Sequence, residues 1–193
     1  MTQRIFELET KRLRLRSWKA EDLPVFADMT ADPEVMRYFP APLSREESDA
    51  GASRIQGLIS QRGWGFWAAE LKETGEFIGF VGLHFQEEGV AIPNTPFVEI
   101  GWRLAKSHWL KGYASEAARE ALRFAFEQNI ADAVYAFTTL ENIPSQKVMD
   151  KIGMSNTGQD FDHPRLLDKP IAVKRHCLYR ITRDEWLVNN NSQ

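Results

Sequence analysis

The feature that most constrains this fold is a glycine turn that opens an alanine-rich helix, in residues 108–127, HWLKGYASEAAREALRFAFE. Small or apolar residues recur there at helical spacing and define one face: Ala114, Ala117, Ala118, Ala121, Leu122 and Ala125. Because these side chains are small, the helix axis can lie close to the element that it covers. Taken alone, the pattern also fits a tightly packed core helix with no further role.

The turn before this helix has the properties of an anion site. The first N–H groups of a helix have no partner within the helix, and the helix dipole places about half a positive charge there. Gly112 lacks a Cβ, so an anion can approach the backbone, and Lys111 adds a full positive charge. The sequence has neither G-x-x-x-x-G-K-[ST] nor G-x-G-x-x-G after a strand, which excludes the two common nucleotide-binding loops.

The hydrophobic pattern predicts an α/β chain forming one domain, residues 1–193 with a core at about 10–186. The expected order is β-α-α-β-β-β-α-β-α-β-β, a mixed and mostly antiparallel sheet with helices on both faces. Expected strands cover 10–18, 65–71, 76–86, 97–105, 133–140, 154–161 and 175–186, and expected helices cover 21–29, 45–61, 113–127 and 143–152. In the first strand, alternation directs Leu13 and Leu15 inward and places Arg12, Arg14 and Arg16 on a solvent-exposed face.

Composition excludes several classes of function. The net charge is −3 and no block of lysines and arginines stands out, so we expect no nucleic-acid partner. The one cysteine, Cys177, cannot form an internal disulfide or a cysteine-rich metal site, and it indicates a reducing compartment. No apolar run approaches the roughly 18 residues that a membrane span needs, and we expect a cytoplasmic protein.

The segment WLKGYASEA, Trp109 to Ala117, resembles the pyrophosphate loop of the GNAT N-acetyltransferase superfamily, Gln/Arg-x-x-Gly-x-Gly/Ala. Gly112 and Ala114 match its last two fixed positions. Trp109 fits the Rim-type branch of ribosomal-protein N-terminal acetyltransferases, which reads W-G-K-G-Y-A here. Leu110 departs from that branch, and we expect it to supply its N–H from a negative φ. The segments TKRLRLR, FVEIGWRL and ENIPSQKVMDKIGM resemble the branch in the same order.

This resemblance implies that acetyl-CoA is the cosubstrate, that no metal takes part, and that the sheet is splayed beside the central strand. The loop that begins at Trp109 would hold the pyrophosphate through N–H groups of Leu110, Lys111, Gly112, Tyr113, Ala114 and Ser115. The strand with Arg103 and Leu104 would pair with the pantetheine arm, and its backbone N–H would stabilise the oxyanion. Asn142 would donate a hydrogen bond to the pantetheine region.

Glu99 is the candidate general base, because it lies in mid-strand between apolar neighbours in FVEIG. Strand alternation places it on the face opposite Val98 and Ile100, and partial desolvation there should raise its pKa toward a useful value. An ion pair with a neighbouring arginine is the alternative. His84, on a nearby expected strand, is a second candidate base, although it has no oriented partner in the sequence and a core histidine explains it equally.

Ser145 is the candidate donor to the leaving thiolate, since it follows Asn142 by one helical turn. A hydrogen bond within its own helix is the alternative. Many members of the superfamily use a tyrosine seven residues after the asparagine, but Met149 occupies that position here. We interpret Cys177 as core packing, which favours direct attack on the thioester over an acetyl-cysteine intermediate.

The predicted function is therefore transfer of an acetyl group from acetyl-CoA to a primary amine. A protein N-terminal α-amine is the first candidate acceptor, because it is the best-known acceptor of the Rim-type branch. A small-molecule amine and a non-catalytic acyl-CoA-binding regulatory module are the alternatives. Dimers are common in this family, so a homodimer is compatible with the resemblance.

Overall fold

The structure is a computed structural model that describes residues 4–191. The chain divides into two compact units, which are described in turn. Unit 1 comprises the chain up to Leu83 together with Gly101–Ala121, and unit 2 comprises His84–Ile100 together with the chain from Leu122. Strands β4 and β5 and helix α3 each contribute residues to both units.

The sheet of unit 1 is antiparallel, in the order β1-β2-β3-β4. Its strands are β1 (Leu8–Glu9), β2 (Leu13–Arg16), β3 (Phe66–Leu71) and β4 (Phe77–Gln86). The turn between β3 and β4 is closed by two hydrogen bonds, from Leu71 N–H to Glu76 O and from Gly75 N–H to Leu71 O, and Gly75 has φ +72°. This is a hairpin turn between two strands that the sequence predicted, with glycine in the left-handed conformation that such turns require.

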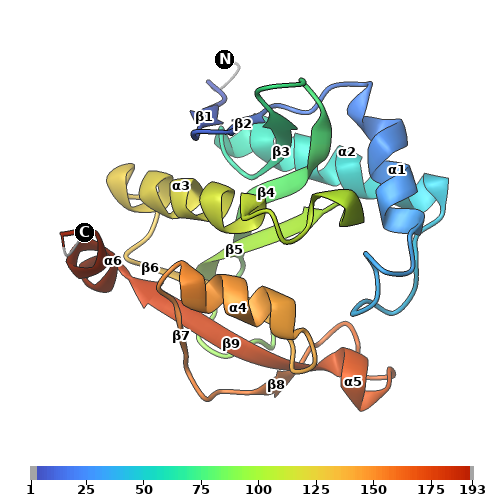
Figure 1. Cartoon of the computed structure of the whole chain (residues 1–193). Helices are drawn as coiled ribbons and strands as arrows, with labels where there is room; N and C mark the ends of the chain where they lie inside the picture. Colours follow the sequence, from blue (N-terminus) through green and yellow to red (C-terminus); the bar gives the residue numbers. More distant parts are fainter. Residues whose placement is uncertain (1–3, 192–193) are drawn as a thin grey trace. The chain divides into compact units, whose positions relative to one another are not determined.

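Two helices of unit 1, α1 (Asp22–Ala31) and α2 (Arg45–Arg62), lie side by side (Figure 1). At the start of α2 the Ser44 side chain accepts from the Glu47 N–H, and the Glu47 carboxylate accepts from the Ser44 N–H. Gly63 ends the helix at φ +80°. Between helices and sheet lies an aromatic core in which Trp18 contacts Phe26, Phe77 and Phe80.

The expected solvent-exposed face of the first strand is wrong at Arg16. Leu13 and Leu15 are fully buried as predicted, but Arg16 is only 5% exposed. Its guanidinium donates to Asp22 at 2.7 Å and to Glu70 at 2.5 Å. The two carboxylates compensate the buried positive charge of Arg16. Because Asp22 lies on α1 and Glu70 on β3, the alternation of residues along β2 alone could not reveal that Arg16 would be buried.

The short 3₁₀ helix η1 (Lys106–His108) precedes α3 (Tyr113–Glu127). Ala117, Ala118, Ala121 and Ala125 of α3 have no exposed surface. The alanine face predicted from the sequence is therefore a buried face.

The sheet of unit 2 centres on β6, which pairs in parallel with β5 and antiparallel with β9. Strands β7 and β8 both pair with β9. The strands are β5 (Phe97–Leu104), β6 (Ala133–Thr139), β7 (Ser155–Asn156), β8 (Phe161–Asp162) and β9 (Arg175–Thr182), and the helices are α4 (Ile143–Lys151), α5 (Ile171–Lys174) and α6 (Arg183–Asn191). A smaller core joins Ile92, Phe97, Phe161 and Leu178.

These elements confirm the predicted fold class, an α/β chain with a mostly antiparallel sheet. The pairs β1–β2, β2–β3, β3–β4, β6–β9, β7–β9 and β8–β9 are antiparallel, and β5–β6 is parallel. The expected last strand is wrong beyond Thr182, where α6 begins. Thr182 and Glu185 form a reciprocal pair there, because the Glu185 carboxylate accepts from the Thr182 N–H and the Thr182 hydroxyl accepts from the Glu185 N–H. The expected strand 154–161 is reduced to two short pieces, and the splaying of the central strands stays a prediction.

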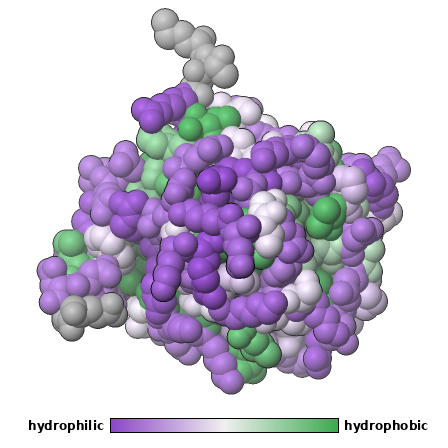
Figure 2. Space-filling view, turned by 45° about the horizontal axis from the view of Figure 1, so that its top comes forward, coloured by the Kyte–Doolittle hydropathy of each residue, from purple (hydrophilic) through white to green (hydrophobic). Residues whose placement is uncertain are grey.

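The exposed face drawn in Figure 2 is mostly hydrophilic, with hydrophobic residues scattered among polar ones. Within residues 4–191 we find no helix whose length and apolar character would let it span a bilayer.

Candidate active site

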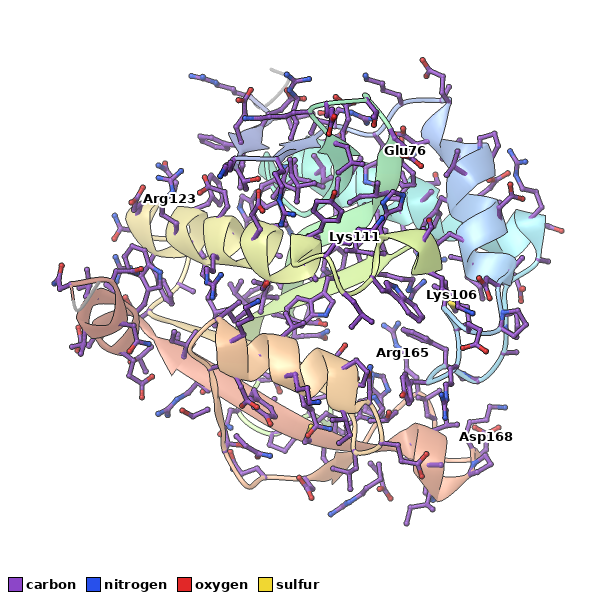
Figure 3. All side chains as sticks on the ribbon, viewed as in Figure 1. Glu76, Lys106, Lys111, Arg123, Arg165 and Asp168 are labelled. Atoms are coloured by element: carbon purple, nitrogen blue, oxygen red, sulfur yellow. The ribbon has the colours of Figure 1, made fainter. Side chains whose placement is uncertain are left out.

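The segment that leads into α3 is fixed in unit 1 by three contacts. The Trp109 indole N–H donates to the Leu104 carbonyl at 2.8 Å, which ties the start of the loop to the end of β5. The His108 backbone N–H donates to Ala105 O, and the His108 ring Nε2 lies 3.2 Å from Glu76 Oε1. Figure 3 labels Glu76, Lys106 and Lys111 around this segment. The loop therefore starts from a fixed point on the sheet.

The first turn of α3 is anchored to the beginning of β2 through Glu116. Its carboxylate accepts from the Thr10 hydroxyl at 2.7 Å, from the Arg12 backbone N–H at 2.8 Å and from Arg12 Nε at 2.7 Å. Burial alone would raise the pKa of Glu116, but the hydrogen bonds from Thr10 and Arg12 outweigh it and hold the pKa below its ordinary value. Arg12 also lies over the Tyr113 ring at 4.4 Å. The negative charge near this helix end is thus already paired.

A row of free backbone donors begins after Trp109. The first hydrogen bond of α3 runs from Glu116 N–H to Gly112 O at 3.0 Å. Among the described residues, the N–H groups of the six preceding positions, Leu110 to Ser115, donate to no protein acceptor. Six consecutive unpaired donors, a helix N-terminus and exposed Lys111 form a cradle that fits a diphosphate.

Two residues of this loop have left-handed backbone conformations. Gly112 has φ +81°, and a Cβ built there would lie 3.4 Å from the Arg12 guanidinium. Leu110 has φ +59° and a fully exposed side chain. The expectation of a negative φ at Leu110 is therefore wrong. A residue with a Cβ occupies a conformation that glycine adopts more readily, and it does so at a cost of about 1 kcal/mol.

In unit 2, Glu99 on β5 accepts a hydrogen bond of 2.7 Å from the Gln86 side-chain amide on β4. Burial raises the pKa of Glu99 to about 7, and the hydrogen bond from Gln86 opposes this rise only in part. No arginine pairs with Glu99 among the described residues, so the alternative of an arginine ion pair is wrong. A carboxylate with this pKa can accept a proton at neutral pH.

Asn142 caps the helix α4. Its side-chain oxygen accepts from the Ser145 N–H at 3.2 Å, and its amide donates to the Thr138 hydroxyl at 2.8 Å. This arrangement brings Asn142 and Ser145 together at one end of α4 and leaves one amide hydrogen of Asn142 for a ligand. Ser145 is half-buried, whereas Met149 is buried in the core.

Cys177 is buried on β9, and its thiol donates to Thr138 O at 3.5 Å. Burial raises the pKa of this thiol, which makes it a poorer nucleophile. The interpretation as core packing is confirmed. Within residues 4–191, no cluster of three His, Cys, Asp or Glu side chains could hold a metal ion.

Comparison with known proteins identifies the family to which the chain belongs. The family model of the acetyltransferase (GNAT) domain matches residues 12–155. The chain belongs to the GNAT acetyltransferase family. It is an N-acetyltransferase, and the fold of this family uses acetyl-CoA.

Two curated relatives and one solved structure illustrate the match. The chain is 34% identical over 174 residues to the uncharacterized protein YkkB of Bacillus subtilis, covering 90% of this chain and 96% of that one. It is 30% identical over 185 residues to the FsC-acetyl coenzyme A-N(2)-transacetylase of Aspergillus fumigatus, covering 93% and 77%. The fold of RimL, a ribosomal L7/L12 alpha-N-protein acetyltransferase in complex with coenzyme A, superposes with a TM-score of 0.71 at 14% identity, covering 93% and 99%.

Sequence reasoning missed two residues that shape the site. Gln86 orients Glu99, and Glu116 anchors the glycine turn. Glu116 carried a signal, because an acidic residue in the first turn of a helix that is expected to bind an anion needs a partner. No local pattern distinguished Gln86, since its role depends on pairing between two strands.

Proposed function

We propose that this chain transfers the acetyl group of acetyl-CoA to a primary amine, with a protein N-terminal α-amine as the first candidate acceptor. The observation that carries the proposal is the run of six unpaired backbone donors from Leu110 to Ser115 at the start of α3. Such a run suits the diphosphate of coenzyme A, and it extends beyond the unpaired N–H groups that any helix has at its start.

The similarity of the fold to RimL supports a protein N-terminus as acceptor, because that protein is named for α-N-protein acetylation. The relative from Aspergillus fumigatus supports the small-molecule alternative, because its name specifies an N(2)-transacetylase of FsC. In either case acetyl-CoA supplies the thioester, and residues of this chain must deprotonate the amine and protonate the thiolate.

Glu99 is proposed as the general base. An α-amine in water has a pKa of about 8, so it is mostly cationic at neutral pH and must lose a proton before its nitrogen can attack. The Glu99 carboxylate takes that proton, and the neutral nitrogen forms a bond to the thioester carbon. The carbon–sulfur bond then breaks, and the nitrogen gives up a second proton, which the leaving thiolate takes up. The pKa of about 7 suits this transfer, because a large fraction of Glu99 is ionised at neutral pH and can accept the proton.

Ser145 and the backbone cradle have the remaining roles. The hydroxyl of Ser145 relays the second proton of the attacking nitrogen to the thiolate as it leaves, so the serine ends the step neutral, and one amide hydrogen of Asn142 contacts the pantetheine arm. The N–H groups from Leu110 to Ser115 hold the diphosphate, with the side chain of Lys111 as a further cation. The strand residues Arg103 and Leu104 pair with the pantetheine through their backbone.

The test is release of free thiol from acetyl-CoA in the presence of amines. Peptides with a free N-terminus are compared with the same peptides N-acetylated, and small primary amines are compared with their tertiary analogues. The proposal expects release with the free amines only, and a loss of turnover of at least tenfold in Glu99→Gln with little change in acetyl-CoA affinity. Tight binding of acetyl-CoA without release by any amine would instead support the acyl-CoA-binding module.

A further inference from the structure

Arg103, near the end of β5, has an unusual environment in unit 1. Its guanidinium lies 4.2 Å from the Phe39 ring centroid and 5.5 Å from that of Phe80. Phe80 belongs to the buried core, whereas Phe39 is 40% exposed in the loop between α1 and α2. The charged group therefore lies between a core aromatic ring and one at the surface.

This guanidinium has no carboxylate partner among the described residues. Its Nε is buried and has no hydrogen-bond acceptor. Burial is the sole cause of a lowered pKa of about 10, and no neighbouring charge offsets it. Arg103 nevertheless remains a cation at neutral pH, because that pKa is about three units higher.

An unpaired, desolvated cation is costly, and cation–π contacts recover only about 0.5–2 kcal/mol of the cost. Arg16, a buried arginine of the same unit, is compensated by two carboxylates, since its guanidinium contacts both Asp22 and Glu70. Arg103 lacks any such pair. A ligand anion would satisfy the free Nε donor, and a planar guanidinium is suited to a carboxylate.

Alternation along β5 indicates where such an anion belongs. Glu99 and Arg103 both belong to β5 and are four residues apart, so strand alternation assigns their side chains to the same face of this strand. The face that carries the candidate base is the acceptor face under the proposed function. We propose that Arg103 binds a carboxylate of the acceptor, so that the substrate is an amine that also carries a negative charge several bonds away.

This inference rests on the proposed function for its acceptor, and the experiment separates the two. Thiol release is measured with matched pairs that differ only in the carboxylate: 6-aminohexanoate and its amide, and a peptide with Asp or with Asn after its free N-terminus. We expect kcat/KM to be at least tenfold higher for the charged member of one pair. The pair that shows this preference tells whether the carboxylate belongs to a small molecule or to a peptide. A preference for the amides in both pairs would contradict the proposal.

The variant Arg103→Met keeps an apolar stem against Phe39 and Phe80 but removes the fork of donors. The ratio of kcat/KM for the charged acceptor to kcat/KM for its neutral partner should fall toward 1 in Arg103→Met. This ratio should be partly retained in Arg103→Lys. The control Arg123→Met removes an exposed arginine that pairs with Glu127 on α3, and it should leave the ratio unchanged. A ratio that survives Arg103→Met would overturn the assignment.

Two further measurements on Arg103→Met answer separate questions. The first asks whether Arg103 binds a ligand or only packs in the fold, and the second asks whether the bound anion belongs to the acceptor or to coenzyme A. A structural cation would make Arg103→Met less stable in urea, whereas a ligand-binding cation predicts equal or higher stability, because an unpaired buried charge is lost. Coenzyme A affinity is measured by calorimetry on the same variant. A loss of more than tenfold would place the bound anion on coenzyme A and reject the acceptor site.

If no amine at all is acetylated, the proposed function fails, but the Arg103 site can still be tested directly. N-acetylglycine, which resembles an acetylated product with a carboxylate, is titrated into protein carrying ¹⁵N-labelled arginine side chains. We expect the Arg103 Nε resonance, assigned as the one missing from Arg103→Met, to shift in a saturable manner. The uncharged N-acetylglycinamide should leave it in place, and equal shifts with both compounds, or none with either, would refute the site.

Discussion

Replacing Glu99 with glutamine should remove a pH-dependent penalty on folding. Burial raises the pKa of Glu99 from 4.5 to about 7, which at about 1.4 kcal/mol for each pH unit corresponds to about 3 kcal/mol. Between these two pH values the unfolded chain has released the proton while the folded chain retains it. Wild-type stability should therefore fall by about 3 kcal/mol from pH 4.5 to pH 8 because of this group alone.

The measurement is urea unfolding of wild type and Glu99→Gln at several pH values, with the difference in unfolding free energy plotted against pH. Subtraction of the two curves cancels the other titrating groups. We expect the stability of Glu99→Gln relative to wild type to rise through that window and to level off above pH 8. A difference that stays flat from pH 4.5 to pH 8 would refute the burial of this carboxylate, and with it the argument for Glu99 as a base tuned to neutral pH.

Other substitutions test the surroundings. Gln86→Leu removes the hydrogen bond that lowers the pKa of Glu99, so the midpoint of the pH–rate profile should move to higher pH, and an unchanged midpoint would reject this orienting role. Asp22→Ala leaves Arg16 with one carboxylate fewer and should lower the unfolding free energy by about 3 kcal/mol in urea, whereas a loss below 1 kcal/mol would contradict a buried pair. Gly79→Ala places a Cβ 2.1 Å from the Arg103 carbonyl at φ +134°, so stability should fall by about 3 kcal/mol or more, and wild-type stability would reject this close approach.

The parts of the fold that local sequence determines were predicted well. Helix α2 begins at the capping box of Ser44 and Glu47 and ends at Gly63, because both signals act within a single turn of helix. The alanine face of α3 was predicted from spacing alone. Helix α6 was missed because its capping pair, Thr182 and Glu185, lies inside a segment whose residues alternate as in a strand.

The parts of the site that were missed depend on contacts between distant segments. The orientation of Glu99 by Gln86 and the two carboxylates around Arg16 come from pairing between strands and helices, which no window of sequence contains. The left-handed φ of Leu110 was missed for another reason. A non-glycine residue is not expected in that conformation, and the loop imposes it.

The central claim is that the backbone donors around Gly112 hold the diphosphate of coenzyme A. Calorimetry of acetyl-CoA and of acetyl-pantetheine, which lacks the diphosphate, tests it on wild type, Gly112→Val and the control Gly158→Val. Gly158 has a similar φ of +73° and open space around it, so the control reproduces the backbone strain elsewhere.

We expect Gly112→Val to lose at least tenfold in affinity for acetyl-CoA while its weaker affinity for acetyl-pantetheine hardly changes, and Gly158→Val to bind both as wild type does. Equal acetyl-CoA affinity in wild type and Gly112→Val would contradict the account.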